Sequence, residues 1–224
     1  MNSHGYKVEL VEEEDSDDAI MNLLQRTFFI DEPMNKALGL CDSGSCPELE
    51  DYCRKALVDG LSVKAVDVEG NIVGVVVSGL ATLNEDSAQD LIRDAESCKN
   101  EKFKKILYVL SRREEGHKLW EKYPEEKQLF DVKLAATDPA WRNKGIMKVL
   151  LERTEQIVRQ KHIRLLRMDT SSAFSAYCAE RNGFTCVYSA KYDDIKMNGE
   201  PLVVPEAPHI DDRVYIKDLL GMLI

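Results

Sequence analysis

The chain has 224 residues, of which 44% are hydrophobic and 31% are charged, and its net charge at pH 7 is −10. This size and balance are typical of a globular protein with one main core, so we expect a single domain over residues 1–224. The negative charge repels nucleic acid and anionic membranes. We therefore expect neither as a partner, and any bound phosphate must meet a local basic patch.

No segment of the sequence has the pattern of an export signal or a membrane span. The N-terminal sequence MNSHGYKVELVEEED lacks a basic start followed by an apolar run, so we expect a cytoplasmic protein. The most apolar stretch, residues 72–83, is too short to cross a bilayer. The six cysteines are then expected to be free thiols, and their spacing matches no zinc pattern, so we expect no metal.

Hydrophobic periodicity and turn residues predict strands and helices that alternate along the chain, which is typical of an α/β fold. The first predicted elements are a strand over 6–11, a helix over 17–29, a loop over 39–47, a helix over 48–58, a β-hairpin of 61–68 and 72–80, and two helices within 84–126 divided near Asn100. They are followed by a strand over 128–136, a helix over 146–160, a strand over 163–168, a helix over 174–181, a strand through Cys186 and Tyr188, a hairpin at Asn198-Gly199 and a last strand over 213–216.

The turn TDPAWRNKG, residues 137–145, joins a predicted strand to a predicted helix and contains two basic residues and a glycine. The first N–H groups of a helix lack intrahelical partners and the helix dipole is positive there, so such a turn can bind an anion. Arg142 and Lys144 add charge that suits a pyrophosphate, and Gly145 lets the backbone approach a ligand closely. The alternative is an ordinary strand-to-helix connection with solvated basic residues.

The stretch VKLAATDPAWRNKGIMKVLLERT resembles the central motif of the GCN5-related N-acetyltransferase (GNAT) superfamily, which cradles the pyrophosphate of acetyl-CoA. The family pattern is Arg/Gln-x-x-Gly-x-Gly/Ala. This chain supplies Arg142 and Gly145 but has Met147 at the last position, whose backbone N–H can donate if its side chain points into the core. The resemblance implies acetyl-CoA as co-substrate, bound by Leu134, Ala135, Ala136, Thr137, Arg142, Asn143, Lys144, Gly145, Ile146, Met147 and Lys148.

A second stretch, SSAFSAYCAERNGF, resembles the superfamily helix that ends in Gly-Phe and runs beside the pantetheine arm. Gly183 fits a helix C-terminal cap. Many members have a tyrosine four residues before that glycine, which protonates the departing thiolate, but here the position is Ala179. That role therefore lies elsewhere or is dispensable.

The sequence RTFFIDEPMN, residues 26–35, is similar to a stretch of the insect arylalkylamine N-acetyltransferases, and DTSSAFSA and PEAPHIDD resemble the same group. The resemblance implies the GNAT fold, a central, mixed, mostly antiparallel twisted sheet of about seven strands flanked by helices. It also implies transfer of acetyl from acetyl-CoA to the primary amine of an arylalkylamine such as dopamine, tyramine, octopamine, tryptamine or serotonin. We expect a monomer, although the sequence does not fix the oligomeric state.

Acetylation of such an amine requires a base, because an arylalkylammonium is protonated at neutral pH and cannot attack a thioester. Glu32 matches the family's glutamate base, acting through ordered water, and Asp31 is the nearby alternative. Without the resemblance, Asp31 and Glu32 fit a solvated loop pair, which exposed acids usually form.

Two serines complete the catalytic group that the resemblance implies. Ser171 and Ser175 are four residues apart, so we expect them on one face at the start of a helix, with Ser172 as an alternative member. A serine before a helix is equally typical of an N-cap that accepts a backbone N–H.

The expected amine pocket combines apolar side chains with a few polar groups. Phe28, Phe29 and Met34 are candidates for its walls, and the alternative for them is packing in the core. The remaining candidate substrate residues are Asp31, Pro33, which fixes the loop of the base, and His209, a proton-relay candidate that otherwise fits a solvated loop histidine.

Two other functions remain open. One is a polyamine or protein-lysine N-acetyltransferase of the same fold, which an open acidic groove would favour. The other is a non-catalytic acyl-CoA binder, for which Met147 and Ala179 are the only indications.

Overall fold

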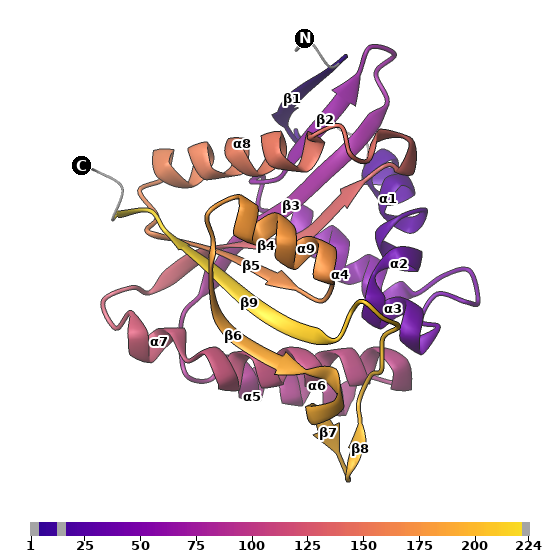
Figure 1. Cartoon of the computed structure of the whole chain (residues 1–224), viewed down its shortest axis with the longest axis vertical. Coiled ribbons are helices and arrows are strands. Elements are labelled where there is room, and N and C mark those ends of the chain that lie inside the picture. Colours follow the sequence, from indigo (N-terminus) through magenta and orange to yellow (C-terminus); the bar gives the residue numbers. More distant parts are fainter. Residues whose placement is uncertain (1–4, 13–16, 221–224) are drawn as a thin grey trace.

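The computed structural model describes residues 5–12 and 17–220. The expectation about an export signal rests partly on residues 1–4 and 13–15, which lie outside this range. Figure 1 shows a twisted central sheet with helices on both of its faces. The strands are β1 (Tyr6–Leu10), β2 (Val63–Asp67), β3 (Ile72–Thr82), β4 (Gln128–Thr137), β5 (Leu165–Thr170), β6 (Thr185–Lys191), β7 (Lys196–Met197), β8 (Glu200–Pro201) and β9 (Asp211–Asp218).

Seven strands form the main sheet in the order β1-β2-β3-β4-β5-β9-β6, and β7 pairs with β8 in a separate hairpin. Only β4 and β5 run parallel, and the other neighbours in the main sheet are antiparallel. The expected mixed, mostly antiparallel sheet of the GNAT fold is therefore confirmed.

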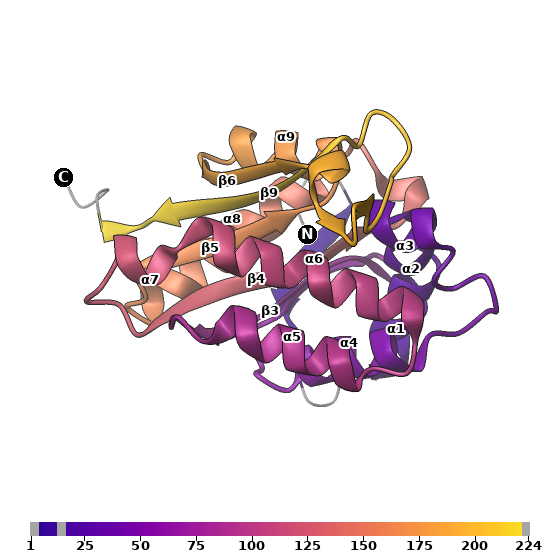
Figure 2. The same ribbon diagram turned by 90° about the horizontal axis from the view of Figure 1, so that it is seen from below.

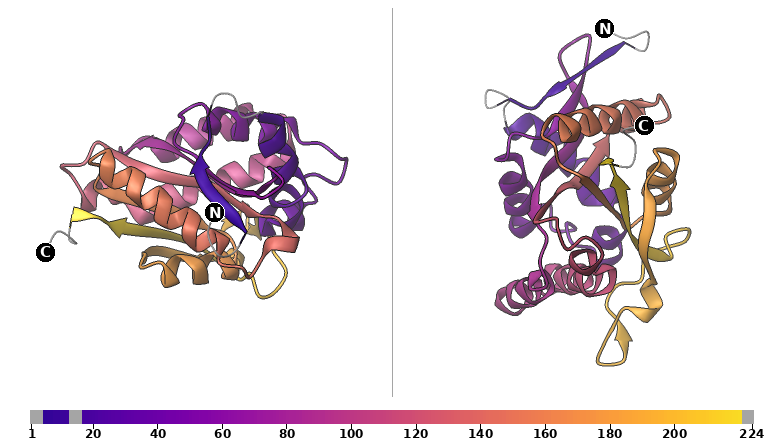
Figure 3. Two further views of the ribbon diagram at one scale, coloured as in Figure 1. Left: turned by 90° about the horizontal axis from the view of Figure 1, so that it is seen from above. Right: turned by 90° about the vertical axis from the view of Figure 1, so that its left-hand side faces the viewer.

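The helices divide between the two faces of the sheet (Figures 2 and 3). Their bounds are α1 (Asp17–Gln25), α2 (Phe28–Asp31), α3 (Pro33–Leu38), α4 (Pro47–Leu57), α5 (Ser87–Ser97), α6 (Glu101–His117), α7 (Leu119–Lys122), α8 (Ile146–Gln160) and α9 (Ala173–Arg181). Apolar residues of α8 and α9 pack on one face around Val76 and Phe130, in what we call the α8-side core. Those of α1, α4, α5 and α6 pack on the other face around Val75 and Val77, in the α6-side core.

The strands β4 and β5 pair over only three residues, from Phe130 to Val132 on β4. Beyond this point β4 continues along β3 as far as Thr137, while β5 continues along β9 as far as Thr170. The two strands therefore part toward their C-terminal ends. The helices α8 and α9 each follow one of these ends, so their N-termini face the opening.

The predicted helix over residues 17–29 is interrupted. It ends as α1 at Gln25, and Thr27 has a non-helical backbone before α2 begins. The β-branched Thr27 uses its hydroxyl to bond the carbonyl of Leu23, which satisfies that group where the helix stops. Pro33 then starts α3, as its fixed φ and missing N–H favour at a first helical position.

Two further differences concern the end of the sheet and the helical middle of the chain. The last strand spans Asp211–Asp218 rather than 213–216, because β9 pairs with both β5 and β6 and its charged ends take part in the pairing. A short helix, α7, follows α6. The predicted division of the two helices near Asn100 is confirmed, and Asn100 is the N-cap of α6.

Within residues 5–12 and 17–220, no helix combines the length and the apolar character needed to cross a bilayer. In the same residues no three His, Cys, Asp or Glu side chains gather in a metal-binding arrangement. The six cysteines are free thiols.

Candidate active site

The N-terminus of α8 is open to a ligand. Gly145 precedes the helix with φ 76°, no side chain caps this end, and a Cβ built at Gly145 would meet no atom within 4 Å. The first backbone bond of the helix runs from Val149 N–H to the Gly145 carbonyl, which leaves the N–H groups before it directed outward. These groups and the helix dipole suit an anion.

The side chains around this turn hold it in place. Ile146 is buried against β3, where a Cβ at Gly74 would approach its Cγ2 to 2.7 Å, so the helix sits close to the strand only because Gly74 has no side chain. The Met147 side chain packs against the α8-side core. Its backbone N–H therefore stays at the open end of the helix, as we expected for a methionine at this position.

The basic residues of the turn are exposed. Arg142 donates from Nη2 to Asp31 Oδ2 at 2.5 Å and from Nε to the Thr137 carbonyl at 3.3 Å. The Lys144 ammonium lies 4.4 Å from the Trp141 ring centroid, and both Asn143 and Lys148 are exposed. The turn therefore brings mobile cations to a bare helix N-terminus, which fits a pyrophosphate group.

The strand residues expected to bind acetyl-CoA lie at the opening between β4 and β5. The backbone of Leu134, Ala135, Ala136 and Thr137 pairs with β3 on one side, while the β4–β5 pairing has already ended. The edge toward β5 thus leaves amide groups free for an extended ligand such as a pantetheine arm.

Glu32 lies between α2 and α3, and its side chain is buried with 8% exposure. Its Oε2 accepts from Asn35 N–H at 2.7 Å, which makes Glu32 the N-cap of α3. Among the residues that the structure describes, Oε1 has no hydrogen-bond partner. Burial raises the pKa of Glu32, and this outweighs the opposing effects of the Ser171 hydroxyl and the Arg113 charge.

The interpretation of Asp31 and Glu32 as a solvated pair is therefore wrong for Glu32. Pro33 and Asn35 are buried beside it as part of α3, because the carboxylate cap draws this turn into the protein. The expectation that Pro33 fixes a loop is corrected: Pro33 begins a helix. Asp31 is exposed and paired with Arg142.

The serines are arranged differently from the prediction. Ser172 is the N-cap of α9 and accepts from Ser175 N–H at 2.9 Å, and the two hydroxyl oxygens are 2.9 Å apart. Ser171 precedes the cap, and its side chain lowers the pKa of Glu32. Ser171 and Ser175 thus do not share a helix face, because α9 begins only at Ala173.

The apolar candidates for the amine pocket belong mainly to the core. Phe29 and Met34 are buried at 3% and 5% exposure in the α6-side core, and Phe28 packs partly against it. The alternative of core packing is therefore correct for Phe29 and Met34.

An exposed aromatic side chain lies elsewhere, at the start of α9. Phe174 is 70% exposed, and its ring meets the His209 ring edge to face with centroids 5.2 Å apart. His209 Nδ1 accepts from Ala173 N–H at 3.2 Å, so the imidazole proton is on Nε2. Burial lowers the pKa of His209, and Lys36 adds to this effect. Sequence reasoning missed Phe174, although an aromatic residue among small ones in SSAFSA was a usable signal.

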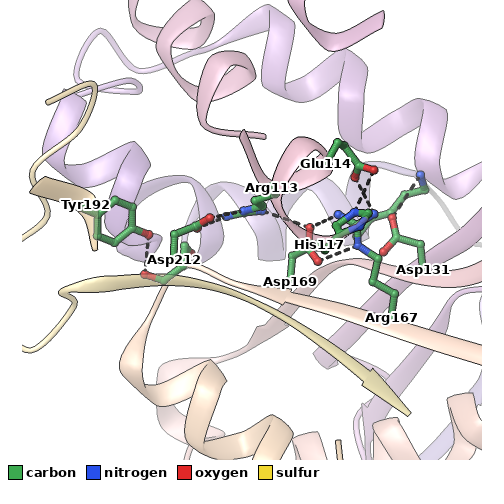
Figure 4. Close-up of polar contacts among 10 residues, drawn as sticks. Arg113, Glu114, His117, Asp131, Arg167, Asp169, Tyr192 and Asp212 are labelled. Atoms are coloured by element: carbon green, nitrogen blue, oxygen red, sulfur yellow. Dashed lines mark hydrogen bonds and ion pairs between the residues drawn. The ribbon is translucent and has the colours of Figure 1, made fainter. Parts of the chain in front are cut away.

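Sequence reasoning also missed a group of buried charged side chains on α6 and the sheet, whose contacts are drawn in Figure 4. Arg113 on α6 pairs with Asp212 on β9, and Arg167 pairs with Asp169 within β5. His117 is fully buried next to Glu114. The sequence RMDT could have indicated this pair, because Arg167 and Asp169 are two residues apart in a predicted strand and so share one face of it.

No family model matches the chain. Among solved structures, the chain is similar to arylalkylamine N-acetyltransferase 2 from Aedes aegypti, with 27% identity over 97% of this chain and 100% of that chain and a TM-score of 0.89. It is also similar to a Drosophila melanogaster polyamine N-acetyltransferase that forms N-acetylagmatine, with 20% identity over 96% and 100% and a TM-score of 0.83. An agmatine N-acetyltransferase mutant in its apo form matches with 20% identity over 96% and 100% and a TM-score of 0.85.

The chain has the GNAT fold. All three matched proteins are N-acetyltransferases, so this fold is that of an acyl-CoA-dependent N-acetyltransferase. The expected resemblance to the insect arylalkylamine N-acetyltransferases is confirmed.

Proposed function

We propose that this GNAT protein transfers acetyl from acetyl-CoA to the primary amine of an arylalkylamine such as dopamine, tyramine, octopamine, tryptamine or serotonin. The observation that carries the proposal is the Glu32 carboxyl, which is buried and has one oxygen without a partner in the described residues. It lies one residue from Asp31, which contacts the proposed cofactor turn.

Glu32 supplies the base. Its raised pKa makes the carboxylate a better proton acceptor than that of an exposed glutamate. Oε1 accepts the ammonium proton directly or through one water, and Oε2 stays fixed by Asn35 N–H. The amine nitrogen is then free to attack.

Acetyl-CoA, as co-substrate, supplies a thioester carbonyl. The N-terminus of α8 with Arg142 and Lys144 would hold its pyrophosphate, and the free edge of β4 would hold its pantetheine arm. Ala179 is fully buried and offers no acid for the leaving sulfur. None is required, because a thiol has a pKa of about 8.5 and leaves readily as thiolate.

We assign the aryl ring to the rim formed by Phe174 and His209. The exposed Phe174 face provides apolar area, and an edge-to-face contact suits an aromatic ligand. His209 is held neutral, so it adds no positive charge that would repel the ammonium.

A polyamine or agmatine is the second candidate substrate. The specific observation in its favour is the similarity to agmatine and polyamine N-acetyltransferases, at 20% identity. Against it, the exposed carboxylate next to the base in the sequence, Asp31, is already paired with Arg142.

The test is acetyl-CoA-dependent thiol release with dopamine, tyramine, tryptamine, agmatine, spermidine and a lysine peptide. We expect turnover with the aromatic amines at kcat/KM values above those of the other three. Turnover with agmatine or spermidine alone would replace the arylalkylamine assignment, and CoA binding without any turnover would identify a non-catalytic binder.

A further inference from the structure

A network of buried charges lies between α6 and the sheet, on the face opposite α8 (Figure 4). We call it the buried charge network, and it consists of Arg113, Glu114 and His117 on α6, Asp131 on β4, Arg167 and Asp169 on β5, and Asp212 on β9. Removing charges from water is costly, and apolar replacements of buried ion pairs are often neutral or stabilising. Stability alone therefore does not account for the network.

One end of the network is the Arg113–Asp212 pair, and the Arg113 charge acts on Glu32. Arg113 donates from Nε and Nη2 to the two oxygens of Asp212 at 2.7 and 2.5 Å. The Arg113 side chain is 6% exposed and that of Asp212 is 0% exposed. Asp169 gives Arg113 a further acceptor at 3.4 Å. Such a two-point contact fixes both the position and the plane of the carboxylate.

Tyr192 connects this pair to the site. Its side chain is buried, its hydroxyl donates to the Ser171 carbonyl at 2.9 Å, and it lies near enough to Asp212 for that charge to act on it. Burial raises the pKa of Tyr192 and the Asp212 charge adds to this, so the phenol keeps the proton that it donates. The Ser171 side chain in turn lies near enough to Glu32 to lower the pKa of its carboxyl.

The opposite end of the network is closed to proton transfer. His117 Nδ1 accepts from Leu119 N–H at 3.1 Å, so the imidazole proton is on Nε2, which lies 3.0 Å from Glu114 Oε2. A neutral histidine fixed by a backbone donor cannot pass a proton on without losing that contact. The network therefore acts as a scaffold of fixed charges.

We infer that Tyr192, oriented by the buried Arg113–Asp212 pair, is a positioning residue that holds the Ser171 hydroxyl against the Glu32 base. The inference rests on the proposed function, and it assigns Tyr192 a role beyond packing. Without the Tyr192 hydroxyl the Ser171 segment loses its anchor, and Glu32 loses the contact that lowers its pKa.

The test compares wild type with Tyr192→Phe, which keeps the ring, and with Tyr108→Phe, which removes a hydroxyl from a half-buried tyrosine of α6. We expect Tyr192→Phe to lower kcat by about ten- to hundredfold, as small misplacements of catalytic groups do. The acid limb of kcat/KM should move to higher pH, because the base then ionises later. Acetyl-CoA binding and the Tyr108→Phe variant should remain at wild-type values.

A measurement that needs no turnover separates this inference from the proposed function. The ¹³C carboxyl signal of Glu32, assigned with Glu32→Gln, should titrate at higher pH in Tyr192→Phe than in wild type. In the Ser171→Ala background, Tyr192→Phe should cause no further shift, because the two changes act through one contact. A shifted titration in a protein that acetylates no amine supports the positioning role and rejects the proposed function. An unshifted titration together with wild-type kcat overturns the positioning role.

Discussion

Arg142 and Asp31, which are 111 residues apart in the sequence, form a hydrogen-bonded ion pair with 2.5 Å between Nη2 and Oδ2. A second ion pair, between Arg26 and Asp138, joins the same two segments, but here the turn supplies the acid and the other segment supplies the arginine. The turn proposed for the pyrophosphate is thereby tied to the segment that carries the proposed base. The proposed cofactor turn and the segment of the proposed base are therefore physically connected.

The first prediction concerns this connection. Asp31→Asn removes the anion that competes with a pyrophosphate for Arg142, so CoA should bind more tightly. Exposed pairs of this kind contribute modestly, so we expect a gain of about two- to fivefold at low salt. Calorimetric titration with CoA measures it, and the gain should shrink at high salt because both charges are half exposed. Unchanged affinity at low salt would show that Arg142 does not meet the pyrophosphate.

The second prediction concerns the stability cost of Glu32. The pKa of Glu32 is higher in the folded state than in the unfolded state, so the folded state binds the proton more tightly. The free energy of unfolding therefore falls as the pH rises from the pKa of the unfolded state to that of the folded state. Glu32→Gln cannot ionise, so its melting temperature should exceed that of wild type above this window by a few degrees and match it at low pH. Calorimetry from pH 4 to 8 checks this, with the exposed Glu121→Gln as control. A difference in melting temperature between wild type and Glu32→Gln that does not change with pH would exclude a raised pKa of Glu32.

The third prediction concerns His209. Its folded pKa is lowered by burial and by Lys36, so the contact with Ala173 N–H is present above the ordinary histidine pKa and is lost as pH falls through the folded pKa. ¹⁵N NMR should show the proton on Nε2 at pH 7 and a titration below that of a free histidine. Lys36→Gln should move the titration upward. A proton on Nδ1 at pH 7 would contradict the assigned contact.

The fourth prediction concerns the aryl rim. Phe174→Ala should raise KM for tyramine and dopamine by about two- to tenfold, the usual value of one aromatic contact. The KM for spermidine should not change. Tyr177→Ala serves as the matched control, since Tyr177 is an exposed aromatic of the same helix that faces Arg181. An equal effect on every amine would place Phe174 outside the aryl site.

The fold was largely predictable from local patterns. The helix over 146–160 was placed at its observed bounds, and the hairpin of β2 and β3 and the division at Asn100 were also predicted. These elements have strong apolar periodicity or a clear cap. The break at Thr27 was missed because residues on both sides of it continue the apolar pattern.

The site was less predictable, because its contacts join distant segments. Glu32 was identified only by resemblance, since nothing local shows that a carboxylate in Asp-Glu-Pro caps a buried helix. Phe29 and Met34 were assigned to the pocket by proximity in sequence, but their helices turn them into the core. Tyr192 carries no local signal, because its two partners lie 20 or more residues away in either direction.

The central claim is that buried Glu32 is the base for acetyl transfer to an arylalkylamine. The most direct measurement is kcat for thiol release with tyramine by wild type and Glu32→Gln, at saturating acetyl-CoA and over a range of pH. The account predicts that the variant loses about hundredfold or more, as expected for a general base, and loses the acid limb of the pH profile. A folded Glu32→Gln variant that retains wild-type kcat and the same acid limb would contradict it.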